Sequence, residues 1–176
     1  MIFSIGTTKT HIDWLNKFQS ISKTPLLITM DAEWGPSQRL SDVFAHPWNM
    51  TLGAIQDNEL VKSISKRMAE QNRALGINYN FSPSVDVNNN SKNPIIGNRS
   101  FGEDPDNVYR KAKAYIMGHK EAGVFTSVKH FPGHGDTDKD SHKTLPVISG
   151  NIERLNKVEL YPFKKLIEDG VVESVM

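Results

Sequence analysis

Short apolar runs alternate with helical patterns along this chain, and this alternation limits the folds open to it. Strand-like runs lie at residues 2–6, 26–30, 77–81, 124–130 and 171–176. Apolar runs without internal alternation are typical of strands buried on both faces. Because helical patterns of about 10 to 20 residues separate the runs, the sequence predicts parallel β-α-β units and an α/β fold. This periodicity leaves an open doubly wound sheet and a closed barrel as alternatives.

Two of the predicted helices carry clear start and stop signals. The first covers about residues 57–75, and Gly76 is a natural stop. Its spacing predicts a core-facing stripe formed by Leu60, Ile64, Met68 and Leu75. The second begins after Asp104, which is a good N-cap followed directly by proline, and it is expected to end before Gly123.

Two further helical patterns lie near the ends of the chain. Residues 10–20 form one of them, with Thr10 as its candidate N-cap and one apolar face made by Ile12, Leu15 and Phe18. Asn151 is expected to cap another helix, which reaches about Leu160. Because proline removes a hydrogen-bond donor and clashes with the preceding turn, Pro162 predicts a kink or a restart.

Length and composition exclude several classes of function. A chain of 176 residues is long enough for one domain with a sizeable core. Its formal net charge of +1 gives no reason to expect nucleic acid or an anionic membrane as a partner. No apolar run approaches the ~20 residues that a membrane span requires. The absence of cysteine excludes disulfides and thiolate chemistry but leaves the compartment open.

A polar segment rich in histidine and aspartate, residues 129–146, directly follows the β-favouring residues 124–128. Pro132, Gly133 and Gly135 indicate a loop of defined shape. Side chains at the carboxyl end of a parallel strand are held by a rigid scaffold and face solvent, which is the usual placement of catalytic residues in α/β folds. By contrast, the Asn-rich segment 86–98 is too polar for a core and is expected to be a surface loop.

Asp140-Ser141-His142 is the most suggestive part of segment 129–146. The carboxylate of Asp140 can accept a hydrogen bond from one imidazole nitrogen, which leaves the other nitrogen of His142 free to exchange protons with a substrate. Taken alone, an Asp-x-His triplet is more often part of a solvated loop.

Three separated blocks resemble one enzyme family, the glycoside hydrolase family 3 β-N-acetylglucosaminidases. The blocks are KHFPGHGDTDKDSHKTLP, PLLITMDAEWGPSQRL and FSPSVDVNNNSKNPIIGNRSFGEDPD. This resemblance selects the (β/α)8 TIM-like barrel over the open sheet. A complete barrel takes about 250 residues. Residues 1–176 are therefore expected to be a partial barrel domain with roughly five of the eight strands, truncated at both ends and without the C-terminal part of the barrel.

The resemblance implies a retaining exo-glycoside hydrolase that removes terminal β-linked N-acetylglucosamine, with peptidoglycan fragments as one source of substrate. It makes His142 the acid/base and Asp140 the residue that holds its tautomer. The family's nucleophile is an Asp in a motif resembling SDDLSM, and this chain has no such motif. We therefore expect the nucleophile to lie outside this chain and the chain alone to be inactive. Relatives occur in both the bacterial cytoplasm and the periplasm.

The resemblance also implies a sugar-binding set drawn from all three blocks. Its members are Asp31, Arg39, Arg99, Lys129 and His130. Arg and Lys donate hydrogen bonds and ionised Asp accepts them, so together they match the mixed needs of sugar hydroxyls. The alternative is an ordinary buried ion-pair network. Glu33 is expected to be structural or to support the binding residues from behind, and Trp34 either stacks on a sugar or covers the core.

Other functions stay open from the sequence. By composition, a divalent metal site of a hydrolase can be drawn from His130, His134, Asp136, Asp138, Asp140 and His142. His130 and His134 lie in a Pro-Gly segment, however, and so cannot share a helical face as a zinc-binding HExxH pair does. We therefore expect no metal and no cofactor. A family 3 β-glucosidase and a catalytically incomplete carbohydrate-binding barrel are the remaining alternatives.

Overall fold

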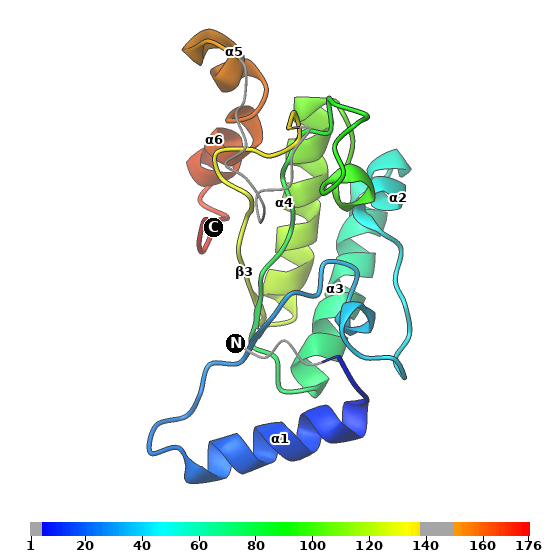
Figure 1. The fold of residues 1–176 in the computed structure, drawn as a ribbon, viewed down its shortest axis with the longest axis vertical. Coiled ribbons are helices and arrows are strands. Elements are labelled where there is room, and N and C mark those ends of the chain that lie inside the picture. Colours follow the sequence, from blue (N-terminus) through cyan, green and yellow to red (C-terminus); the bar gives the residue numbers. More distant parts are fainter. Residues whose placement is uncertain (1–4, 138–149) are drawn as a thin grey trace.

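Helices surround a small parallel sheet in the computed structural model, which describes residues 5–137 and 150–176 (Figure 1). In chain order the elements are α1 (Thr8–Ile21), β1 (Thr29–Met30), η1 (Pro36–Gln38), α2 (Asn49–Ala54), α3 (Asn58–Ala74), β2 (Tyr79–Asn80), η2 (Gly97–Arg99), α4 (Pro105–Glu121), β3 (Phe125–Thr126), α5 (Ile152–Lys157) and α6 (Tyr161–Glu168). None of the described helices is long and apolar enough to cross a membrane.

The sheet has the order β1-β2-β3, and neighbouring strands are parallel. Thr29 pairs with Tyr79, which pairs in turn with Phe125. The strands predicted within 26–30, 77–81 and 124–130 are therefore present, although each is shorter than its apolar run. The predicted α/β fold is confirmed: the structure is mixed α/β with a small parallel sheet, as in a partial barrel.

Isolated parallel bridges extend the sheet beyond its strands. Ser84 pairs with Lys129 just past the ends of β2 and β3. Val128 pairs with Val175, so the run predicted at 171–176 lies beside the end of β3. Gly6 pairs with Leu40, a residue outside the three strands, and the rest of the run predicted at 2–6 lies largely outside the described residues. Four of the five predicted runs therefore contribute to the sheet, one of them as a single bridge.

Helices α3 and α4 pack side by side and cover the sheet (Figure 1). Asp57 and Asp104 cap them, each accepting a hydrogen bond from the backbone N–H two residues on. The cap at Asp104 and the two glycine stops were predicted, whereas Asp57 was predicted only as the approximate start of its helix. The predicted stripe on α3 is wrong in part, because Leu60 is half exposed. Met68 is buried as predicted. The other buried residues of the helix are Val61, Ser65, Ala69 and Asn72.

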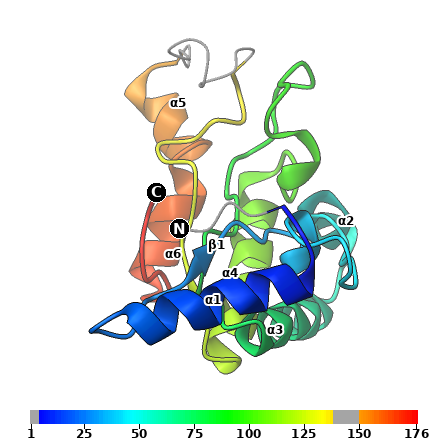
Figure 2. The ribbon, with the colours of Figure 1, turned by 60° about the horizontal axis from the view of Figure 1, so that its bottom comes forward.

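Helix α1 lies across one end of the molecule, at the bottom of Figure 1 and in front in Figure 2. The predicted cap at Thr10 is wrong: the helix begins at Thr8, and the Thr7 hydroxyl accepts a bond from the Thr10 backbone N–H at 3.3 Å. The predicted apolar face is only partly buried, since Ile12 and Phe18 are well exposed. The helix contacts the core through His11 and Leu15.

Two local predictions near the C-terminus are confirmed. The Asn151 side chain caps α5 by accepting a hydrogen bond from the Arg154 backbone N–H at 2.9 Å. The helix ends at Lys157, and α6 begins at Tyr161 with Pro162 in its first turn. The restart places Phe163 and Leu166 in the main core, beside α4.

The Asn-rich segment 86–98 is only partly the surface loop that was predicted, because exposed positions alternate with buried ones. Asp86 and Val87 are fully buried, and Asn93 is nearly so. The Asn93 amide donates to the carbonyls of His134 and Gly135 at 2.6 and 3.1 Å. Polar side chains are buried here because they satisfy the backbone of the loop that follows β3.

Candidate functional site

The loops after β1, β2 and β3 meet at one edge of the sheet. Because the strands are parallel, their carboxyl ends share that edge. β1 leads to Asp31 and Glu33, β2 leads to Asp86, and β3 leads to Lys129 and His130. The strand ends thus bring together charged side chains that lie up to 98 positions apart in the chain.

Lys129 is the centre of the ion-pair network at this edge. Its side chain is only 3% exposed, and its ammonium nitrogen lies 2.7 Å from Asp31 Oδ1 and 2.9 Å from Glu33 Oε1. The other oxygen of Asp31 accepts a bond from Arg39 Nη2 at 3.1 Å. Burial raises the pKa of Asp31, but the charges and hydrogen bonds of Lys129 and Arg39 outweigh burial and lower it below its usual range.

Arg99, which ends η2, forms a bidentate pair with Glu33. Nε donates to Oε2 at 3.0 Å and Nη2 to Oε1 at 2.8 Å. The Glu33 side chain is 1% exposed, and burial raises its pKa, but the bonds and charges of Arg99 and Lys129 lower it overall. Glu33 therefore stays ionised, and its buried carboxylate holds Arg99 and Lys129 in place.

A second buried carboxylate, Asp86, supports His130. Its Oδ2 lies 2.6 Å from His130 Nδ1 and accepts a bond from the Ser84 hydroxyl at 2.8 Å. Its Oδ1 accepts the backbone N–H of His134 at 2.6 Å. Burial raises the pKa of Asp86, but the hydrogen bonds and charge of His130 and the other donors lower it overall. The carboxylate is therefore ionised and saturated with donors.

Most of these side chains line a cleft of about 560 Å³. The lining residues are Asp31, Glu33, Gln38, Arg39, Ile95, Arg99, Lys129, His130, His134 and Met176. The cations Arg39, Arg99 and Lys129 are balanced by two carboxylates of the lining, Asp31 and Glu33, and by Asp86, which is buried behind His130. The cleft is therefore highly polar with little net charge, which suits a neutral ligand with many hydroxyl groups.

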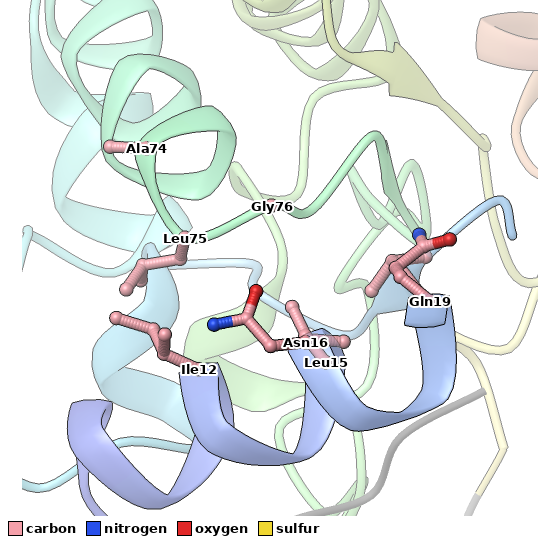
Figure 3. A pocket seen from close by; sticks show the side chains of 8 residues that line it. Ile12, Leu15, Asn16, Gln19, Ala74, Leu75 and Gly76 are labelled. Atoms are coloured by element: carbon pink, nitrogen blue, oxygen red, sulfur yellow. The ribbon is translucent and has the colours of Figure 1, made fainter. Parts of the chain in front are cut away.

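Another hollow, between α1 and the end of α3, differs in its chemistry (Figure 3). It holds about 240 Å³ and is lined by Ile12, Leu15, Asn16, Gln19, Ile28, Ala74, Leu75 and Gly76. Its lining carries no charged side chain, and the amide of Gln19 is bonded to the backbone of Leu26. The charged cleft is therefore the candidate site.

All five predicted sugar-binding residues line the cleft. Asp140 and His142, the predicted catalytic pair, lie outside the described residues. The chain just before them is firmly held: the carboxylate of Asp136 accepts a bond from Arg154 at 2.6 Å, and Arg154 also pairs with the buried Glu159 at 2.9 Å.

Trp34 stacks on Trp48 with ring centroids 4.0 Å apart, so one face of the Trp34 ring is covered by the ring of Trp48.

The sequence does not predict one of the carboxylates that organise the site. Glu33, expected to be structural or to support the binding residues, is buried and pairs with two of the predicted residues. Asp86, by contrast, lies in the segment predicted to be a surface loop. A local signal exists for Asp86, because it follows the end of a strand by a few positions. As for the proposed metal site, no group of three or more His, Asp or Glu side chains within ranges 5–137 and 150–176 is arranged so that it could hold a metal ion. Asp138, Asp140 and His142 fall outside these ranges.

The fold and the site together define a class of protein. It is a parallel α/β domain with a polar, charge-balanced cleft at its strand ends. The chain belongs to glycosyl hydrolase family 3, since the model of that family's N terminal domain matches residues 8–176. It is 39% identical over 163 residues to the "Beta-hexosaminidase A" of Pseudoalteromonas piscicida, covering 90% of this chain and 27% of the relative.

Solved structures give the same family with close backbone agreement. A family 3 β-N-acetylglucosaminidase from Paenibacillus sp. str. FPU-7 superposes with a TM-score of 0.89 at 43% identity, over 97% of this chain and 33% of that one. The β-glucoside phosphorylase BglX, bound to 2FGlc, superposes with a TM-score of 0.92 at 31% identity, over 98% and 31%. The chain thus spans about a third of these structures' length.

Proposed function

We propose that this chain is part of a retaining exo-glycoside hydrolase that removes terminal β-linked N-acetylglucosamine. The observation that carries the proposal is the charge-balanced cleft at the strand ends. The names of its relatives, a β-hexosaminidase and a β-N-acetylglucosaminidase, support the choice of sugar. Peptidoglycan fragments are one source of such termini.

The exposure of the cleft residues suggests how they divide the work. The side chains of Asp31, Arg39 and Arg99 are 19%, 21% and 22% exposed, so they can reach a ligand without rearrangement. That of His130 is 31% exposed. Lys129 is nearly buried, but an ammonium group has three donors, and among residues 5–137 and 150–176 its ion-pair partners are Asp31 and Glu33. A third donor can therefore serve a hydroxyl group.

The chemical step needs groups beyond the described cleft. A retaining glycosidase uses an acid/base and a carboxylate nucleophile. We assign the acid/base to His142, oriented by Asp140, because an imidazole titrates near neutral pH without the desolvation that a Glu requires. The nucleophile is assigned to a segment outside this chain. None of the cleft carboxylates suits that role, because each already accepts hydrogen bonds from cations or buried donors.

The test is hydrolysis of 4-nitrophenyl N-acetyl-β-glucosaminide and of the matching β-glucoside by a full-length protein that contains this chain. We expect selective turnover of the acetamido sugar and a loss of about 100-fold or more in His142→Ala, typical of a missing general acid. A more acidic leaving group should restore part of the rate in this variant. Preferred turnover of the glucoside would instead favour a β-glucosidase, and no turnover by the folded protein would favour a binding barrel.

A further inference from the structure

Asp86 is fully buried, and every hydrogen bond it makes is one it accepts. Its donors are His130 Nδ1 at 2.6 Å, the His134 backbone N–H at 2.6 Å, the Ser84 hydroxyl at 2.8 Å and the His130 backbone N–H at 3.4 Å. A carboxylate without exposure to solvent costs free energy unless its oxygens are satisfied, as they are here. The side chain does not line the cleft, so it acts on a ligand only through its neighbours.

The two nitrogens of His130 face partners of opposite kind. Nε2 lies 3.1 Å from Arg99 Nη2, and a guanidinium group can only donate a hydrogen bond. Nε2 must therefore accept and carry no proton. Nδ1 faces the Asp86 carboxylate, which can only accept, so the ring proton is on Nδ1. The charged groups packed around this ring are thus Asp86 on one side and the Arg99–Glu33 pair on the other.

We propose that Asp86 is a positioning residue that keeps the His130 proton on Nδ1, so that the single lone pair of Nε2 accepts a hydrogen bond from Arg99 and fixes the guanidinium group that lines the cleft. Arg99 is then held at three points, by Glu33, by His130 and by the Ile95 carbonyl. Each cation of the cleft is anchored by a carboxylate: Arg39 by Asp31, Lys129 by Asp31 and Glu33, and Arg99 by Glu33. The hydrogen-bonding groups that face a sugar therefore have fixed directions. This inference deepens the proposed function at the same site, although its first test does not depend on turnover.

The first test reads the tautomer directly. In protein labelled with nitrogen-15 histidine, the two-bond couplings between ring nitrogens and carbon-bound protons distinguish a protonated Nδ1 from a protonated Nε2. The His130 signals are those missing from His130→Asn. We expect a neutral ring with the proton on Nδ1 at pH 7 in the unsubstituted protein. A proton on Nε2, or on both nitrogens, would overturn the inference, and this measurement needs no variant of Asp86 to fold.

The second test removes the charge but keeps the shape, with Asp86→Asn. The amide oxygen is expected to keep the backbone N–H of His134, which leaves the amide N–H facing His130 Nδ1. The ring proton must then move to Nε2, where it meets the Arg99 donor. The matched control is Ser84→Ala, which removes a donor from the same carboxylate oxygen without changing its charge. We expect the tautomer to switch in Asp86→Asn and to stay unchanged in Ser84→Ala; no switch in a folded Asp86→Asn would contradict the role.

Kinetics of the full-length protein then separate positioning from general loss of structure. Because Asp86 acts through His130 and Arg99, Asp86→Asn should lower kcat/KM about 10- to 100-fold. Adding Arg99→Ala should cost less in that background than alone, because the coupling is already broken. Additive losses would overturn the inference while leaving the proposed function intact. If the unsubstituted protein turns over no glycoside but shows the Nδ1 tautomer, the proposed function fails and the positioning role of Asp86 survives.

Discussion

At the residue scale, the cleft concentrates charges that stability alone does not require. Lys129 and Glu33 are almost fully buried, and bringing two ions out of water costs several kcal/mol each before their attraction offsets it. Well-packed apolar side chains would be at least as stabilising in the same space. The network holds donors and acceptors in fixed positions, which the proposed binding of a polar ligand requires.

A different buried group, His119, contributes to the fold and not to the cleft. Its Nε2 accepts from the Asn80 amide at 3.0 Å, and its ring stacks on Tyr115. Ser65 donates its hydroxyl proton to the Tyr115 carbonyl, so its oxygen accepts from His119 Nδ1 at 2.7 Å. The imidazole is therefore neutral, and burial lowers its pKa from the usual 6.5 to about 3.

This histidine should make the fold sensitive to mild acid. Between pH 6.5 and about 3 the unfolded chain binds a proton at His119 that the folded chain excludes. Its contribution to stability is therefore complete above pH 6.5 and is lost as the pH falls. From pH 7 to 5.5, where most carboxylates stay ionised, the free energy of unfolding should fall by about 1 kcal/mol from this residue.

Urea denaturation at these two pH values checks this expectation. His119→Gln keeps a neutral hydrogen-bonding side chain, so the pH-dependent loss should shrink by about 1 kcal/mol even if the variant is less stable overall. His46→Gln is the control, at a partly exposed ring that bonds Gln71 at 2.8 Å. An unchanged pH dependence in His119→Gln would show that this ring is not kept neutral by the fold.

At the element scale, most helix ends could be predicted from the sequence, although the cap of α1 is Thr7 and not Thr10, and helix faces could be predicted only in part. The caps Asp57, Asp104 and Asn151 act on backbone within their own first turn, so the local sequence contains the whole interaction. The face of α3 depends on partners far along the chain. Its buried Ser65 bonds to Tyr115 and His119, 50 and 54 positions away, and a hydrophobic pattern cannot anticipate such polar burial.

The close packing of α3 and α4 depends on Gly118. A Cβ at this position would overlap the backbone of Lys62 and Lys66 in α3. Alanine normally stabilises a helix interior relative to glycine by about 1 kcal/mol. We expect the reverse for Gly118→Ala, a loss of about 1 to 3 kcal/mol, because the helices must separate.

Thermal or urea unfolding measures this effect, with Gly6→Ala as the control. A Cβ at Gly6 has no neighbour within 4 Å, so that substitution should change the stability little. Equal or higher stability of Gly118→Ala would mean that the two helices are not packed as closely as described.

At the scale of the whole molecule, the sequence predicted which side chains line the cleft, but it did not predict the buried carboxylate of Asp86 that supports His130. The resemblance placed five side chains in one pocket, and all five line the cleft. Asp86 was missed because its partner His130 lies 44 positions away and its own segment reads as polar surface. The roles of Asp140 and His142 stay predictions, since both lie outside the described residues.

The binding of N-acetylglucosamine, measured by titration calorimetry, tests the central claim that this cleft holds the terminal sugar. The comparison uses the full-length protein, Asp31→Asn in the cleft and the matched Asp169→Asn, whose carboxylate bonds Tyr109 and Lys113 on the outer surface. We predict saturable binding that Asp31→Asn weakens about 10- to 100-fold, as expected for the loss of charge-assisted hydrogen bonds, and that Asp169→Asn leaves unchanged. Undiminished binding by a folded Asp31→Asn, or none by the unsubstituted protein, would contradict the account.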